Sequence, residues 1–82
     1  MLKKIAVLDF VESKGVVRRK DLIKFMVELA GHTYDSQEHR GHYSTALCPT
    51  SWGAYLLRPS KNDDRYLFRC GRGLYKVRHY LH

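Results

Sequence analysis

The chain has 82 residues, of which 44% are hydrophobic and 28% are charged. This composition excludes an intrinsically disordered protein, and the length predicts one small globular domain spanning residues 1–82. Fifteen Lys and Arg residues outnumber eight Asp and Glu, for a formal charge of +7. Such an excess favours a nucleic-acid partner, because neutralised phosphates release counterions. The alternative is a basic surface that has no anionic partner.

The N-terminus, the apolar runs and the two cysteines indicate the cellular compartment. Its N-terminus lacks the pattern of a secretory signal, and no apolar run approaches the roughly eighteen residues that a membrane span needs. We therefore expect a cytoplasmic protein in which Cys48 and Cys70 are free thiols. A single disulfide between them is the alternative.

Apolar side chains crowd residues 2–14, but their spacing does not distinguish a helix from a strand. The length of the segment favours a helix. Its end does so too, because Lys14 supplies a cation to the last turn and Gly15 follows. We predict a helix over residues 2–14, with a strand across Ile5–Val11 as the competing interpretation.

The clearest periodicity lies in the segment Arg18–Ala30. At about 100° per residue, one helical face carries Leu22, Phe25, Met26 and Leu29, whereas charged residues occupy the opposite arc. This pattern predicts an amphipathic helix whose apolar stripe, including Phe25 and Leu29, lies in the core.

The flanking segments are shorter. Gly15-Val16-Val17 is predicted to be a tight linker, which makes the first two helices a helix–turn–helix unit. Residues 31–38 are predicted to form a loop. Residues 40–48 have room for about two turns of a third helix, which Pro49 would terminate.

The last thirty residues predict a basic β-hairpin preceded by a further strand. Strands are expected at Ala54–Arg58, Arg65–Cys70 and Leu74–Tyr80, where Tyr, Leu, Phe and Val are frequent. The connections are 59–64, which is rich in turn residues, and 71–73, which has two glycines. Residues 53–82 hold seven basic and two acidic side chains, a net charge of +5.

Three short motifs lie within this order of elements. They are Arg40-Gly41-His42-Tyr43-Ser44, Gly53-Ala54-Tyr55-Leu56-Leu57-Arg58-Pro59 and Arg65-Tyr66-Leu67. With these motifs, nearly the whole chain resembles the winged helix-turn-helix superfamily. The resemblance implies an α+β fold of about three helices followed by a three-stranded antiparallel sheet or wing. It also implies DNA binding, with a helix in the major groove and the wing on the backbone or in the minor groove.

The basic residues and the polar residues of the predicted third helix are candidates for contacting nucleic acid. Arginine forks match phosphate geometry, and small hydroxyls bond phosphates or bases. The alternatives are arginines that cover apolar surface and hydroxyls that bond local backbone. The candidates are Arg18, Arg19, Arg40, His42, Tyr43, Ser44, Thr45, Arg58, Lys61, Arg65, Arg69 and Arg72.

Other chemistry is disfavoured by the sequence. The histidines and cysteines lack the close Cys pairs of structural zinc sites, so no metal or cofactor is expected. A chain this small rarely builds a substrate pocket, so no catalytic residue is expected either. We predict a small regulator of transcription or of a mobile element that binds duplex DNA, as a homodimer where an extended site must be read. The rival hypotheses are an RNA-binding module and a protein–protein adaptor.

Overall fold

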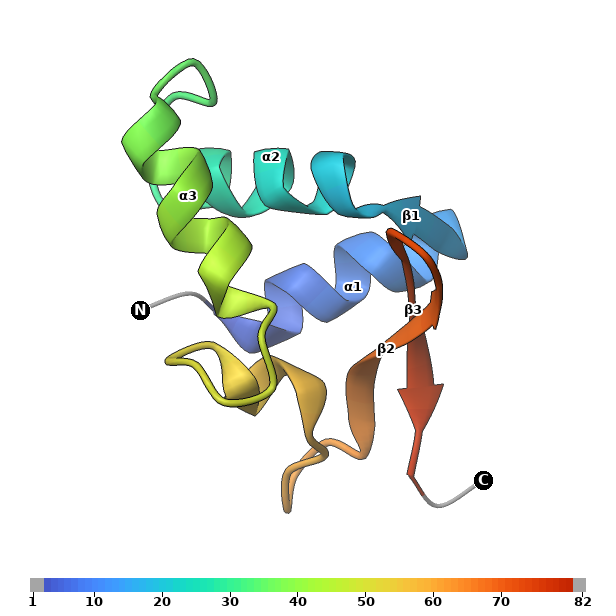
Figure 1. Cartoon of the computed structure of the whole chain (residues 1–82). Coiled ribbons are helices and arrows are strands. Elements are labelled where there is room, and N and C mark those ends of the chain that lie inside the picture. The colour runs from blue at the N-terminus through green and yellow to red at the C-terminus, as the bar shows by residue number, and fades with distance from the viewer. Residues whose placement is uncertain (1–2, 81–82) are drawn as a thin grey trace.

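A computed structural model describes residues 3–80. Four helical segments and three strands follow one another along the chain (Figure 1). They are α1 (Lys4–Lys14), β1 (Val16–Arg18), α2 (Arg19–Leu29), α3 (Gln37–Ala46), the 3₁₀ helix η1 (Ala54–Leu57), β2 (Arg65–Gly71) and β3 (Leu74–His79). The predicted α+β class, with three helices and a three-stranded antiparallel sheet, is confirmed.

The first two helices form where the sequence predicts them, and the competing strand over Ile5–Val11 is wrong. Helix α1 ends at Gly15, which takes φ 82°, a left-handed conformation that costs glycine no Cβ clash. The prediction for the linker is wrong, because Val16–Arg18 forms strand β1 and pairs antiparallel with β3. Two β-branched valines and alternating burial suit a strand at this position.

The predicted strand at Ala54–Arg58 is also wrong. Two successive i→i+3 bonds, from the Ala54 N–H to the Ser51 carbonyl and from the Leu56 N–H to the Gly53 carbonyl, wind this segment into η1. Gly53 packs so closely on α3 that an added Cβ would lie 2.3 Å from the Ala46 carbonyl oxygen. The η1 segment contacts β2 without pairing with it as a strand, and β1 takes the third place in a sheet of order β1-β3-β2.

Helix α3 is longer and begins earlier than predicted. Ser36 caps it, because its Oγ accepts a hydrogen bond from the His39 N–H at 3.4 Å. The predicted loop over residues 31–38 is therefore wrong for Gln37 and Glu38. The helix ends at Ala46, before Pro49 is reached.

The core lies between the three helices and one face of the sheet. Leu22 and Met26 of α2 are fully buried, together with Val7, Leu8 and Val11 of α1, Leu56 of η1 and, on the sheet, Leu67 and Tyr75. Phe25 stands at the edge of the core and stacks on Phe10 with ring centroids 4.1 Å apart. The predicted core position of Leu29 is wrong, because its side chain lies at the end of α2 and is 39% exposed.

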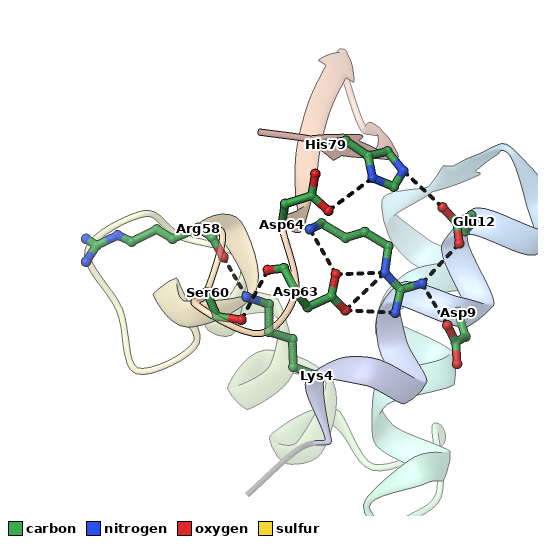
Figure 2. Close-up of polar contacts among 9 residues, drawn as sticks. Lys4, Asp9, Glu12, Arg58, Ser60, Asp63, Asp64 and His79 are labelled. Atoms are coloured by element: carbon green, nitrogen blue, oxygen red, sulfur yellow. Dashed lines mark hydrogen bonds and ion pairs between the residues drawn. The ribbon is translucent and has the colours of Figure 1, made fainter. Parts of the chain in front are cut away.

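Arg65, the first residue of β2, joins the hairpin to α1. Its Nη1 donates to Asp9 at 2.8 Å and to Glu12 at 3.0 Å, while Nη2 donates to Asp63 at 2.9 Å. Figure 2 shows these three carboxylates meeting from two segments of the chain. The Arg65 side chain is only 15% exposed. Its hydrogen bonds with Asp63, and then with Asp9, raise its pKa further above the ordinary value.

A second set of contacts holds the same end of the molecule. His79 of β3 lies 3.3 Å from both Glu12 and Asp64, and the Lys4 ammonium donates to the Arg58 carbonyl (Figure 2). Partial burial lowers the pKa of Lys4, an effect that Asp63 opposes. Among residues 3–80, no helix has both the length and the apolar character needed to cross a bilayer.

The difference in burial between Leu22 and Leu29 of α2 gives a first prediction. Leu22→Ala should lower the free energy of unfolding by about 2–5 kcal/mol, because it leaves a cavity in the core. Leu29→Ala, on the same helical face but at the exposed end of α2, should cost about 0.5 kcal/mol or less. Urea denaturation of both variants measures the difference, and equal losses would contradict the placement of α2.

The Arg65 network gives a second prediction. The hydrogen bond from Arg65 lowers the pKa of Asp63 below its ordinary 3.8. The stability that this pair contributes is therefore present above that value and is lost as the pH falls through the lowered native pKa. Between about pH 6 and about pH 3, the urea midpoint of Asp63→Asn should fall less than that of the unmodified chain.

A matched control for this experiment is Asp35→Asn, which removes an exposed carboxyl from the loop before α3. Its midpoint should fall with pH as far as that of the unmodified chain. If Asp63→Asn also shows the full fall, the ion pair contributes nothing to stability.

Candidate nucleic-acid interface

A groove separates the hairpin from the turn that follows α3. Two adjoining cavities of about 320 and 400 Å³ form it, and both are lined by Leu47, Pro49, Arg69 and Tyr75. Arg19 lines one end and Arg58 the other. We call it the hairpin groove, defined by Arg19, Leu47, Pro49, Arg58, Arg69 and Tyr75. The described residues that line it include three arginines and no carboxylate.

Arg19 is held in place by two other elements. Its backbone N–H donates to the Gly73 carbonyl at 2.8 Å, and its Nη2 donates to the Ser44 carbonyl at 3.0 Å. The first bond joins the start of α2 to the turn between β2 and β3, two segments that lie side by side in Figure 1, and the second bond joins Arg19 to α3. A guanidinium has five N–H donors, so Arg19 keeps donors for an anion after bonding Ser44.

Arg69 faces the groove because of the strand register. It pairs with Tyr75, which is buried, so both side chains point to the same face of the sheet as Leu67. The register shifts between Arg69 and Gly71, and this bulge ends the regular pairing just before the turn. Arg72 follows as an exposed residue of the turn, where Gly73 takes φ 69°.

Helix α3 presents a small, polar face beside this groove. Glu38, Gly41, His42 and Thr45 are its exposed positions at helical spacing. A Cβ added at Gly41 would meet nothing within 4 Å, and the residue does not have positive φ. Neither packing nor backbone conformation in this chain therefore requires glycine there, although it weakens the helix.

Trp52 extends this surface. Its ring stacks on His42 with centroids 4.6 Å apart and stays 40% exposed. Tyr43 contacts the same ring edge-on at 5.7 Å. The sequence offered one signal for Trp52, a lone tryptophan in a polar turn, but nothing that placed it against α3.

The other predicted residues are distributed over the whole molecule. Tyr43 is 7% exposed and belongs to the core, so its predicted contact with nucleic acid is corrected: helical periodicity turns it inward. Ser44 is half-buried, and its carbonyl accepts from Arg19. The Thr45 hydroxyl donates to the Gly41 carbonyl at 3.0 Å.

Besides Arg72 on the hairpin turn, four of the predicted cations lie outside the groove. Arg65 is occupied by its three carboxylates, so it is no longer a candidate phosphate ligand. Lys61 lies in the acidic connection before β2. Arg40 covers the Tyr34 ring, with its Cζ 5.2 Å from the ring centroid. Arg18 ends β1 and is exposed.

The cysteines and histidines form no metal centre in the described part of the chain, where no three candidate ligands come together. Both cysteines are exposed free thiols. Hydrogen bonding to Thr50 lowers the pKa of Cys48, which lies at the Arg19 end of the groove. His32 and His39 stack with centroids 3.9 Å apart, and the buried Nδ1 of His39 has no hydrogen-bond partner.

No family model, curated protein or solved structure matches this chain. Its function must therefore be inferred from its own charges and geometry.

Proposed function

We propose that the chain binds duplex DNA in the manner of a winged helix-turn-helix protein. The observation that carries this proposal is the hairpin groove, which three arginines and no carboxylate line beside the exposed face of α3. The order α1-β1-α2-α3-β2-β3 with sheet order β1-β3-β2 also supports it. A net charge of +7 supplies the long-range attraction.

The groove and the hairpin turn bind the phosphate backbone in this proposal. Arg19 and Arg69 lie on two walls of one cavity, and Arg72 continues the cationic surface onto the turn. Guanidinium forks bond phosphate oxygens in pairs and fix the register of a protein on the duplex. Arg58 extends the cationic track at the far end of the groove.

Helix α3 enters the major groove, which is wide enough for an α-helix. The bare backbone at Gly41 lets the helix approach the base edges closely. His42 and Thr45 lie on the same exposed face and present polar groups, and Arg40 stands on the flank of the helix. These three side chains are the candidates for reading sequence.

The biological role that fits such a small binding protein is regulation of transcription or of a mobile element in the cytoplasm. A homodimer would let the chain read two half-sites, since one α3 covers only a short site.

A third prediction tests the phosphate contacts. Affinity for random duplex DNA should fall log-linearly with salt, because binding releases counterions. Arg69→Ala and Arg72→Ala should each make the slope shallower by about one unit. Lys61→Ala removes an exposed cation outside the groove and should leave the slope unchanged. Fluorescence anisotropy at several salt concentrations measures all four slopes.

Two results would overturn this proposal. One is the absence of duplex binding at low ionic strength. The other is an equal change of slope in all three variants, which would mean that net charge acts without a defined surface.

A fourth prediction separates stability from binding at one residue. Gly41→Ala should raise the free energy of unfolding by about 0.5–1 kcal/mol, because alanine favours the helix and the added methyl meets nothing. The same methyl would stand between α3 and the bases. Affinity for a selected duplex should therefore fall about fivefold or more, the lower end of the ~1–3 kcal/mol cost of a lost base contact.

Ser13→Ala is the matched control, because Ser13 is exposed on α1 and gains helix propensity in the same way. It should not change affinity. If the Gly41→Ala variant is more stable but binds duplex with unchanged affinity, α3 does not contact the bases.

A further inference from the structure

The sheet has a second face, opposite to the one that covers the core. Val17, Leu67 and Tyr75 are buried on the inner face, so their neighbours along each strand point outward. We call this the outer sheet face, defined by Arg18, Tyr66, Phe68, Leu74, Lys76 and Arg78. It spans all three strands.

Cations and aromatic rings alternate on this face. Tyr66 pairs with Arg78 and Phe68 pairs with Lys76 across the β2–β3 register. The Arg78 Cζ lies 4.4 Å from the centroid of the Phe68 ring. This is the geometry of a cation–π pair, and a guanidinium that lies over a ring leaves its other side for stacking with a base. Leu74, 37% exposed, adds apolar surface beside them.

The face has no negative charge of its own. No Asp or Glu occurs in β1, β2 or β3, and the acidic contacts of the hairpin go to Arg65 and His79 at its far end. A second copy of this face would bring like charges together, which disfavours a homodimer built on it. An anionic partner is what the charge complements.

We propose that the outer sheet face binds single-stranded nucleic acid. Bases would stack on Tyr66 and on the Phe68–Arg78 pair, and phosphates would contact Arg18 and Lys76. The Tyr66 and Phe68 side chains are half-buried. Aromatic rings at a surface favour a single strand over a duplex, because duplex bases are already stacked and cannot lie on a ring. Every base has a π-face, so stacking of this kind does not depend on sequence.

The cations of this surface lie apart from the proposed duplex surface, although Tyr66 and Phe68 also border one cavity of the hairpin groove. The pleat turns Arg69 toward the groove and turns Lys76 and Arg78 away from it. Lys76 and Arg78 lie on the central strand β3 and line neither cavity of the groove. Substitution of Lys76 or Arg78 therefore leaves the residues that line the groove unchanged.

The test is a titration of the isotope-labelled full chain with polyuridine and with polydeoxythymidine of about ten nucleotides, a length within the range one small domain covers. Backbone amide shifts should change in residues 66–68 and 76–78 and not in α3. Equal binding of the two probes means recognition of bases and phosphates alone, whereas a preference for polyuridine adds a contact with the 2′-hydroxyl. Either result supports the proposal.

Variants give a second readout. Arg78→Gln should weaken single-strand binding about fivefold or more, the lower limit for loss of one stacking contact, and leave duplex binding unchanged. Arg69→Gln should do the reverse. Lys24→Gln, on the exposed side of α2, is the control for losing one charge. Thermal melting verifies that all three variants fold.

Four outcomes would overturn the proposal, and a fifth would overturn the proposed function instead. Binding of duplex without binding of single strands would contradict a single-strand site on the outer sheet face and leave the proposed function intact. Binding of single strands without binding of duplex would contradict the proposed function alone. Equal losses for Arg78→Gln and Arg69→Gln, or shifts confined to α3, would mean that both probes use the duplex surface. Shifts of the sheet amides with polyglutamate but with neither oligonucleotide would assign the face to an acidic protein.

Discussion

The ion pairs of Arg65 hold the C-terminal hairpin against α1, and both proposed surfaces depend on that contact. Three carboxylates from two segments surround one guanidinium that is 15% exposed. Water and salt screen such a half-buried network less than an isolated ion pair at the surface, which contributes little to the stability of a protein. Because Asp63 precedes β2 while Asp9 and Glu12 lie on α1, the network sets where β2 starts.

Beyond that anchor, the pleat of the hairpin distributes cations of one type to three roles. Arg65 is neutralised at the start of β2, Arg69 turns inward to the groove, and Arg78 turns outward onto Phe68. The alternation of side chains along a strand separates Arg78 from Arg65 and Arg69, which share the inner face, and the carboxylates around Arg65 then separate Arg65 from Arg69. A cationic hairpin of +5 is thus divided between a proposed duplex surface and a proposed single-strand surface.

Local sequence patterns predicted the elements whose interactions are local. Helices α1 and α2 and the β2–β3 hairpin all form close to their predicted bounds, because helical periodicity, a terminal glycine and turn residues act over a few positions. Strand β1 and η1 were missed because their partners are remote: Val16 pairs with Lys76, and Gly53 packs on Ala46. Two valines and an arginine cannot be recognised as a strand until the partner strand is in place.

The sequence by itself determined the charge, the amphipathic stripe of α2 and the number of arginines in the hairpin. Only the tertiary structure decided which of those arginines remain open to an anion. Arg65 and Arg69 are the same residue type and lie four residues apart on one strand. Only Arg65 is neutralised by Asp9 and Glu12, which lie more than fifty residues away from it in the sequence. Folding likewise buries Tyr43, which the sequence predicted to contact nucleic acid, and stacks Trp52 on His42, a contact that the sequence did not predict. The environment of a side chain is made by residues that folding, and not sequence order, brings beside it.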